Sequence, residues 1–249
     1  MSSHIGIVGV SPEGAALFYR QLMRQSGRSL GQHQQPRISI HNEPLPMYLD
    51  AIRKDDWHGV GKLLRRSAEL LYRCGADFCL TPDTSVEHGV YLAEVGSPIP
   101  WMTMADLVAQ AVTTDQRKCV GLIGTKLTMF SSTYQTHLGL RGIQVLPPDD
   151  AEAEWLDRIF FGELIYGHIR PDSRLYVLQA IDRPAGRGCE AVILACSEAP
   201  LLVTADNSPL PVYDAADILA EAAVRRAGEL TAAGGQVGGN GATVSTRIA

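Results

Sequence analysis

The sequence lacks the excess of basic residues that would mark a nucleic-acid-binding protein. Its 22 lysines and arginines are outnumbered by 27 aspartates and glutamates, and its net charge is -5 at pH 7. Binding to nucleic-acid phosphates needs a clustered basic face that displaces counterions. The basic runs here, such as residues 62–66, are sparse and are typical of the solvated side of a helix. Nucleic acid is therefore not expected as a partner.

Long apolar runs are missing as well. No run reaches the roughly 18 residues that a membrane-spanning helix needs. The first residues lead directly into a strand-like stretch, without the basic region, long apolar stretch and small-residue cleavage site of a secretory signal. We therefore expect a soluble, cytoplasmic protein that does not bind a membrane.

Motifs for common cofactors are also absent. The five cysteines are odd in number, and no two of them have the CxxC spacing of a zinc or redox site. The turn Gly6-Ile7-Val8-Gly9 lacks the remaining glycine of the dinucleotide-binding fingerprint. No motif for a nucleotide, a metal or pyridoxal phosphate stands out, so we expect free thiols, no cofactor and no metal site.

Short apolar runs bounded by glycine and proline alternate with longer segments of helical period. This pattern is typical of an α/β fold in which mainly parallel sheets are flanked by helices. In segment 57–74 apolar residues recur at intervals of three and four, so this helix is expected to cover a sheet face. The expected strands are residues 5–8, 37–41, 78–80, 119–123, 143–146 and 191–195, and the expected helices are residues 13–25, 57–74, 104–113 and 151–166.

The two halves of the chain show a weak internal repeat. Residues 6–9 resemble residues 121–124, and residues 75–83 resemble residues 188–196. In the second pair, a buried strand delivers one reactive side chain at its carboxyl end, Asp83 in the first copy and Cys196 in the second. Ligands of open α/β sheets bind at the carboxyl ends of strands. The repeat therefore predicts two similar lobes with a site in the cleft between them.

Domain boundaries follow from this repeat. We expect an N-terminal lobe of residues 1–100 plus 208–230 and a second lobe of residues 101–207. Residues 231–249 are rich in glycine and alanine and have little to bury. A segment of this composition does not recover its ordering entropy, so a flexible tail is expected there.

Asp83 and Cys196 each have a structural and a chemical interpretation. Cys196 directly follows an apolar strand, so it fits both a buried structural thiol and a catalytic one. A thiol that faces helix N-termini can have its pKa lowered from about 8.5 towards neutrality. Asp83 is equally suited to cap the helix that follows it. The residues alone leave both alternatives open.

Four stretches follow one another along the chain: residues 5–14 with Phe18 and Tyr19, residues 121–129 with Tyr134, residues 192–202, and residues 210–214. The first is a glycine turn followed by Ser-Pro-Glu-Gly. The second reads Gly-Leu-Ile-Gly-Thr-Lys-Leu-Thr-Met, and the third contains Ala-Cys-Ser-Glu-Ala-Pro-Leu-Leu. Together they resemble the motifs of the pyridoxal-independent aspartate/glutamate racemases. They occur in the same order as in that family, and the resemblance extends from about residue 4 to residue 228.

The resemblance implies both a fold and a chemistry. It implies a two-lobed homodimer that needs no cofactor and uses two opposed acid/base groups on the two faces of a substrate α-carbon. Cys196 falls at the position of the family's second catalytic cysteine, and Asp83 falls at that of the first. We therefore expect an amino-acid racemase or epimerase with Asp83 and Cys196 as the opposed pair.

The aspartate in place of a cysteine changes the expected chemistry. An ordinary aspartate has a pKa near 3.9, against about 8.5 for cysteine, so Asp83 can donate a proton near neutrality only if burial raises its pKa. The family's arginine and lysine for the distal carboxylate align near Tyr48 and Tyr166. Without these cations, the resemblance implies a substrate that is less acidic than aspartate or glutamate, and larger or aromatic.

Polar residues near expected helix starts are candidates for binding the substrate carboxylate. Backbone N–H groups and hydroxyls at helix N-termini bind anions, and helix capping is the alternative role of each residue. Glu198 could orient a proton-transfer group or stabilise a helix N-terminus. The expected substrate-binding residues are Ser11, Thr84, Ser85, Thr125, Lys126, Ser197 and Glu198.

Two other functions fit the same residues. A single cysteine that protonates one face resembles the arrangement of arylmalonate decarboxylase, although an ionised Asp83 would repel a departing carboxylate. The absence of one thiol also fits a catalytically inactive homologue that binds a small molecule. Exchange of the α-proton with solvent, release of carbon dioxide, and thermal stabilisation by a ligand distinguish the three functions.

Overall fold

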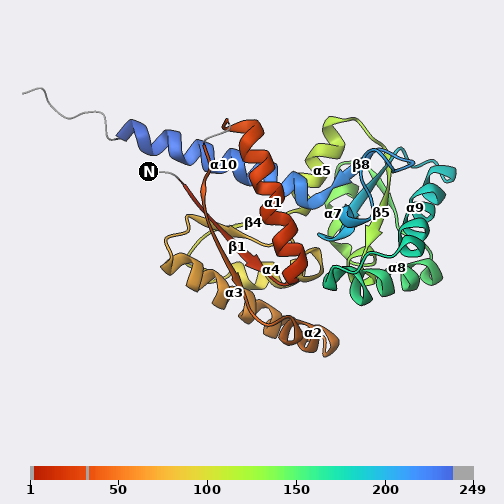
Figure 1. Ribbon diagram of the computed structural model, residues 1–249, viewed down its shortest axis with the longest axis horizontal. Coiled ribbons are helices and arrows are strands. Elements are labelled where there is room, and N and C mark those ends of the chain that lie inside the picture. The colour runs from red at the N-terminus through yellow and green to blue at the C-terminus, as the bar shows by residue number, and fades with distance from the viewer. Residues whose placement is uncertain (1–2, 32–33, 238–249) are drawn as a thin grey trace, which may run out of the picture.

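The protein consists of two α/β lobes that lie side by side (Figure 1). This computed structural model describes residues 3–31 and 34–237. Each lobe contains a four-stranded sheet in which neighbouring strands are parallel. The expected α/β fold with two similar lobes is confirmed.

The sheet of the first lobe has the strand order β2-β1-β3-β4. Its strands are β1 (His4–Gly9), β2 (Arg37–Asn42), β3 (Phe78–Leu80) and β4 (Trp101–Met102). Its helices are α1 (Pro12–Ser29), α2 (Leu45–Arg53), α3 (Trp57–Arg73) and α4 (Glu87–Glu94), with a 3-10 helix, η1, at Thr84–Val86. The apolar stripe of α3, which includes Val60, Leu64 and Leu71, is buried as its period predicts.

The sheet of the second lobe has the strand order β6-β5-β7-β8. Its strands are β5 (Cys119–Gly124), β6 (Gln144–Leu146), β7 (Ala191–Ala195) and β8 (Val212–Asp214). Its helices are α5 (Ala105–Thr114), α6 (Lys126–Met129), α7 (Ser132–Gly139), α8 (Asp150–Gly162) and α9 (Pro171–Gly186), with 3-10 helices η2 (Leu164–Tyr166) and η3 (Ala199–Leu201). Helix α9 is not among the expected helices, because Pro184 weakens its helical pattern. Pro184 has no N–H to donate to the carbonyl four residues earlier, and the helix ends two residues later, at Gly186.

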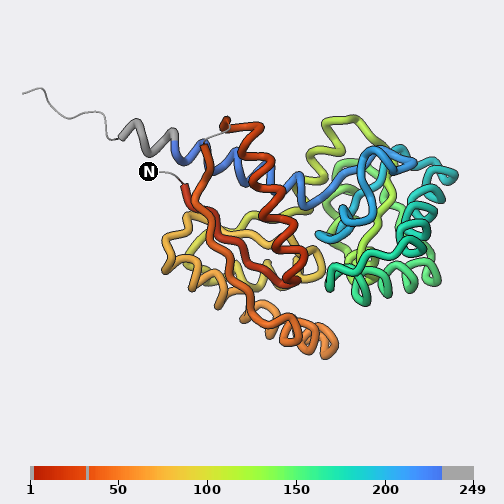
Figure 2. The backbone as a smooth tube through the Cα atoms, viewed as in Figure 1, coloured from red at the N-terminus to blue at the C-terminus, as the bar shows by residue number. Residues whose placement is uncertain are grey.

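The last helix, α10 (Ala215–Val237), connects the two lobes. It begins directly after β8 and packs against α1 of the first lobe and α5 of the second (Figures 1 and 2). One large hydrophobic core consequently extends across both lobes, with Phe18 and Phe78 in the first and Leu156 in the second. A second, smaller core lies between α3 and the first sheet.

The observed lobes differ from the expected boundaries in two places. Segment 208–230 is expected in the first lobe, but β8 pairs with β7 in the second sheet, with Val212 opposite Val192. Conversely, β4 at residues 101–102 belongs to the first sheet, because it pairs with β3. Composition cannot decide which sheet a short strand joins, because both open edges offer the same unpaired backbone groups.

Helix α10 also extends past residue 231, where the sequence predicts the start of the tail. The helix continues to Val237 because it is rich in alanine, the residue with the highest helix propensity. The remaining residues of the expected tail, 238–249, lie outside the described residues. In the part of the chain that the structure describes, no helix, α10 included, combines the length and the apolar character that crossing a membrane requires.

The two sheets have equivalent topologies, as the internal repeat predicts. Strands β1 and β5 occupy equivalent inner positions, and so do β3 and β7. Asp83 lies just after β3, and Cys196 directly follows β7. Both side chains therefore lie at the carboxyl ends of equivalent strands.

Candidate active site

Asp83 is held by two backbone N–H groups of the first lobe. Its Oδ1 atom accepts a hydrogen bond from the N–H of Ser85 at 3.1 Å and so caps the 3-10 helix that follows. Its Oδ2 atom accepts a hydrogen bond at 3.3 Å from the N–H of Ser11, in the turn between β1 and α1. The capping role expected for Asp83 is therefore present, and the same carboxylate links two loops.

Burial changes the acid strength of Asp83. Its pKa is raised to about 7, mainly because burial disfavours the charged form and secondly because the carboxylate of Glu198 is close. The hydrogen bonds from Ser85 and Ser11 act in the opposite direction without cancelling the effect. Near neutral pH, Asp83 can thus exist both as an acid and as a carboxylate, which is the condition for a role in proton transfer.

Cys196 is buried at the end of β7, with 5% of its surface exposed. Its thiol donates a hydrogen bond to the Oε2 atom of Glu198 at 3.2 Å. Burial raises the pKa of Cys196 well above its usual range, and the carboxylate of Glu198 raises it further. Burial and the neighbouring carboxylate thus act against the lowered pKa that a thiol facing helix N-termini could have. Cys196 is consequently a protonated thiol, which suits it to donate a proton.

Glu198 interacts with both proton-transfer candidates and is only 2% exposed. Its Oε2 atom accepts hydrogen bonds from the thiol of Cys196 and from the hydroxyl of Ser197, the latter at 2.9 Å. Its Oε1 atom is buried and has no hydrogen-bond partner among the described residues. Its charge raises the pKa of both Asp83 and Cys196, so one carboxylate adds to the effect of burial on both groups.

The first turn of α1 approaches Ser197 and Glu198 closely at Gly14. A Cβ atom at this position would lie 2.9 Å from Oε1 of Glu198 and would collide with the hydroxyl of Ser197. Ser11 caps the same helix, because its hydroxyl accepts a hydrogen bond from the N–H of Gly14 at 3.2 Å. Gly14 is not among the site residues expected from the sequence. The available signal is a glycine in a helix, where it is unfavourable unless a close approach requires it.

Hydroxyl groups form a buried chain that joins the two lobes. Thr84 donates a hydrogen bond to the carbonyl of Ala195 at 2.7 Å, and its Oγ1 atom lies 3.2 Å from Oγ1 of Thr128. The Ser85 hydroxyl pairs with that of Thr125 at 3.1 Å, and Thr125 pairs with Thr128 at 3.0 Å. Thr128 is not among the expected site residues, although its spacing of three from Thr125 places both on one helical face.

Lys126 does not join this group. Its ammonium group pairs with the carboxylate of Glu154 at 2.7 Å, where both side chains are about half exposed. Its backbone N–H donates a hydrogen bond to Asp157 at 2.7 Å. Successive side chains of a helix diverge by roughly 100°, so Lys126 points towards α8 while its neighbour Thr125 faces the first lobe. The expectation that Lys126 lies with the other substrate-binding residues is therefore corrected.

The two tyrosines that stand in place of the family's cations lie in different environments. Tyr48 is fully buried in the smaller core of the first lobe. Tyr166 is 58% exposed and lies beside His168. Tyr48 is thus a core residue in this conformation, whereas Tyr166 is a surface residue of the second lobe.

Two cavities adjoin the site. One of about 10 Å³ borders Asp83 and Glu87, which is room for about one water molecule. The other, of about 220 Å³, is lined by Ser85 together with residues that include Trp57 and His88, and by no lysine, arginine or carboxylate. Among residues 3–31 and 34–237, no three His, Cys, Asp or Glu side chains are grouped so that they could hold a metal ion. The space beside Asp83 admits an amino acid only after the surrounding groups move apart.

One family and several solved structures resemble this chain. The Asp/Glu/Hydantoin racemase family matches residues 7–223. A candidate Asp/Glu racemase from Yersinia pestis is 28% identical, covering 90% of this chain and 99% of its own, with a TM-score of 0.79. An aspartate racemase homologue from Pyrococcus horikoshii OT3 is 27% identical, covering 93% of this chain and 100% of its own, with a TM-score of 0.76. Picrophilus torridus aspartate racemase, at 21% identity, shares the fold, with a TM-score of 0.74 over 91% of this chain and 94% of its own.

Proposed function

The chain belongs to the Asp/Glu/hydantoin racemase family, and we propose that it is a cofactor-independent amino-acid racemase or epimerase in which Asp83 and Cys196 are the opposed acid/base groups. Family and fold together support an isomerase of the racemase type. One observation carries the assignment of residues. Asp83 and Cys196 lie at the carboxyl ends of equivalent strands, and the carboxylate of Glu198 raises the pKa of both.

The protonation states of the two groups indicate the direction of each proton transfer. In its ionised form Asp83 accepts the α-proton, and the electron pair of the broken C–H bond stays on the substrate carbon. The thiol of Cys196 then donates its proton to the opposite face, and a thiolate remains. The substrate leaves with inverted configuration, while the site holds a protonated Asp83 and an ionised Cys196. Exchange with solvent, or inversion of the other enantiomer, restores the starting state.

The buried hydroxyls are suited to bind the substrate α-carboxylate. Thr84, Ser85 and Thr125 lie beside Asp83, and Ser197 lies beside Cys196. The first three hydroxyls pair with groups of the opposite lobe in this conformation. A carboxylate would exchange these pairs for hydrogen bonds to its own oxygens when the lobes separate. Substrate binding and lobe movement are therefore linked in this proposal.

The surroundings of Asp83 favour a substrate with an uncharged side chain. The 220 Å³ cavity beside Ser85 is lined by Trp57 and His88, whose ring centroids lie 5.1 Å apart in an edge-to-face arrangement. No lysine or arginine of the described residues lines it. A second carboxylate on the substrate would lack a charged partner there. An uncharged side chain fits these walls better, because they combine the Trp57 ring with the hydroxyls of Ser131, Ser132 and Thr133. Asp83→Cys, which supplies the family's first cysteine, is accordingly expected to gain no turnover of aspartate, and a gain would contradict this substrate class.

Proton NMR in deuterated water tests the proposed function. A panel of D- and L-amino acids is followed for loss of the α-proton with the wild type, with Cys196→Ala and with Cys74→Ala, which removes an exposed thiol. We expect exchange with the wild type and Cys74→Ala. The rate with Cys196→Ala should fall by roughly 10²–10⁴-fold, the usual contribution of general acid/base catalysis, for the enantiomer whose α-proton faces Cys196. Absence of exchange with every amino acid, or exchange of both enantiomers by Cys196→Ala at the wild-type rate, would refute the proposal.

A decarboxylase is the second candidate function. Because the pKa of Asp83 is about 7, this side chain can be neutral near neutrality and would then not repel a departing carboxylate. Cys196 could in that case deliver one proton to one face of the product. Release of carbon dioxide from a disubstituted malonate, without exchange of amino-acid α-protons, would support this function in place of racemisation.

We also propose that the protein is a cytoplasmic homodimer. The family resemblance supports the dimer, and the five free cysteines suit a reducing compartment. Light scattering coupled to gel filtration measures the assembly directly. A mass of one chain across the working concentration range would exclude the dimer.

A further inference from the structure

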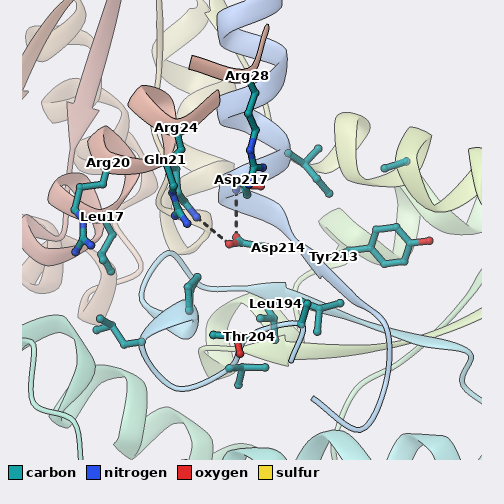
Figure 3. A pocket seen from close by; sticks show the side chains of 17 residues that line it. Leu17, Arg20, Gln21, Arg24, Arg28, Leu194, Thr204, Tyr213, Asp214 and Asp217 are labelled. Atoms are coloured by element: carbon teal, nitrogen blue, oxygen red, sulfur yellow. Dashed lines mark hydrogen bonds between the residues drawn. The ribbon is translucent and has the colours of Figure 1, made fainter. Parts of the chain in front are cut away.

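A cavity of about 740 Å³ lies between α1 and the second lobe (Figure 3). One wall is formed by α1, and the other walls come from β7, the segment that follows it, β8 and the start of α10. Neither Asp83 nor Cys196 lines this cavity, and none of the buried hydroxyls described above does. Its volume lies within the range of roughly 300–1,000 Å³ that is typical of small-molecule sites.

Three arginines line the cavity along one face of α1. Arg20, Arg24 and Arg28 follow one another at intervals of four residues, so they span about 12 Å along the helix axis. Within the described residues, none of the three forms an ion pair with a carboxylate. Like charges at this spacing destabilise a helix. An anion bound beside them would remove this repulsion.

The acidic residues of the opposite wall already have partners. Asp214 accepts a hydrogen bond from Gln21 at 2.8 Å, and its other oxygen accepts from two backbone N–H groups at the start of α10. Asp217 accepts a hydrogen bond from Gln25 at 2.9 Å. Figure 3 shows Gln21 between the arginines, with its contact to Asp214. Both carboxylates are thus hydrogen-bonded to glutamines. Arg24 is near enough to act against the raised pKa of Asp214, but it forms no ion pair with it among the described residues, so the guanidinium groups keep their hydrogen-bond donors for a ligand.

Two further features of the lining point to an organic ligand. The side chain of Gln21 is 2% exposed, and its amide oxygen has no hydrogen-bond partner among the described residues. A buried acceptor of this kind is uncommon and can take a hydroxyl or N–H donor from a ligand. Next to it, Leu17, Leu194 and Leu201 form an apolar part of the wall that would cover an uncharged ring.

We propose that this cavity is a binding site for an elongated small polyanion with an attached uncharged ring, the chemistry of a nucleoside diphosphate. The guanidinium group of arginine binds phosphate oxygens in pairs. A single phosphate is too short to reach from Arg20 to Arg28, whereas a diphosphate with its neighbouring sugar and base spans such a distance. Because the walls belong to both lobes, the bound ligand stabilises their present arrangement. The site is separate from the proposed catalytic pair.

Isothermal titration calorimetry with ADP and with pyrophosphate, at constant ionic strength, tests this site. The test variant is Arg20→Gln/Arg24→Gln/Arg28→Gln. The control variant, Arg53→Gln/Lys62→Gln/Arg73→Gln, removes the same charge from exposed positions on α2 and α3 of the same lobe. We expect saturable binding by the wild type and the control, tighter for ADP than for pyrophosphate. The test variant should bind at least about tenfold more weakly. ADP should raise the unfolding temperature of the wild type, and the rise should grow with the concentration of ADP relative to its Kd.

Two results would overturn the proposal. One is no saturable binding of either probe to the wild type, and the other is equal binding by the test variant and the control. Circular dichroism confirms that both triple variants are folded. Cys196→Ala is expected to bind ADP like the wild type. Binding of ADP therefore tests this site whether or not the protein proves to be a racemase.

Discussion

The thiol of Cys196 donates a hydrogen bond to the Oε2 atom of Glu198 at 3.2 Å, and the charge of Glu198 also raises the pKa of Asp83. One buried carboxylate therefore adds to the effect of burial on two side chains that belong to different lobes. Burial and this carboxylate together raise the pKa of Cys196 well above its usual range and that of Asp83 to about 7. Glu198 is consequently a positioning residue, because it acts through the two groups proposed to exchange protons with the substrate.

Glu198→Gln removes this charge and keeps the shape of the side chain. The pKa of Cys196 and that of Asp83 should both fall, because the carboxylate raises each of them. The rising part of the pH–rate profile for α-proton exchange is therefore expected to move to lower pH. Thiolate absorbance of Cys196, followed during a pH titration, should also appear at lower pH. Glu69→Gln, at an exposed position of α3, is the control and should change neither profile.

Asp83→Asn replaces a proton acceptor with a neutral side chain that keeps one acceptor oxygen, so it can accept a hydrogen bond from the N–H of Ser85 while the N–H of Ser11 loses its acceptor. We expect kcat to fall by roughly 10²–10⁴-fold with the fold intact. In the wild type, Asp83 accepts a proton only when ionised, so the rate should rise as the pH increases through about 7. This rise should be absent from the residual activity of Asp83→Asn. Asp182→Asn, at the surface of α9, should retain the wild-type profile, and a rise that persists in Asp83→Asn would exclude Asp83 as the base.

Gly14→Ala tests the close approach of α1 to the site. The added methyl group would displace the Ser197 hydroxyl, which donates a hydrogen bond to Glu198. We expect a lower kcat with a cooperative unfolding transition retained. Gly27→Ala is the matched control, because it lies in the same helix with no atom within 4 Å of the new Cβ. That variant should keep full activity and gain about 0.5–1 kcal/mol of stability, the usual difference between alanine and glycine in a helix. Equal activities of the two variants would show that the approach at Gly14 is unimportant.

Glu87→Gln is expected to stabilise the protein at alkaline pH. Burial raises the pKa of Glu87 to about 7, while one oxygen accepts a hydrogen bond from the N–H of Ala105 and the other has no partner among the described residues. The pKa of Glu87 is higher in the folded protein than in the unfolded chain. At pH values between the two, the folded state binds more protons than the unfolded state. The stability contributed by this group is therefore lost as the pH rises through about 7.

Glutamine cannot ionise, so Glu87→Gln should unfold like the wild type near pH 4 and require roughly 3 kcal/mol more free energy of unfolding at pH 8. Urea titrations at both pH values measure the difference. A variant that is equally or more destabilised at pH 8 than at pH 4 would contradict the assignment of a buried, weakly acidic Glu87.

The regular elements could be predicted wherever burial leaves a strong local pattern. The strands at Phe78–Leu80 and Ala191–Ala195 are expected at the same residues, because buried parallel strands are apolar runs bounded by turn residues. Helix α9 lacks so clear a signal, since Pro184 lies in its last turn. The lobe to which β8 belongs could not be predicted either, because strand pairing is a tertiary contact.

Part of the candidate site was also within reach of the sequence. The internal repeat placed Asp83 and Cys196 after equivalent strands, and the motifs brought Ser11, Thr125 and Ser197 into the same set of residues. The exclusion of Lys126 depends on the direction of its side chain towards Glu154. The importance of Gly14 depends on its distance from Ser197. Neither is a property of local sequence.

The sequence by itself determined the two-lobed α/β architecture and the chain positions of the two candidate acid/base groups, because hydrophobic periodicity and repeated strand–turn patterns are local properties. The tertiary structure decided their chemistry. Asp83 is paired with Ser11 and influenced by Glu198, and Cys196 is buried against the same glutamate. A pKa depends on desolvation and on the distance to other charges, and both are fixed only when segments far apart in the chain pack together.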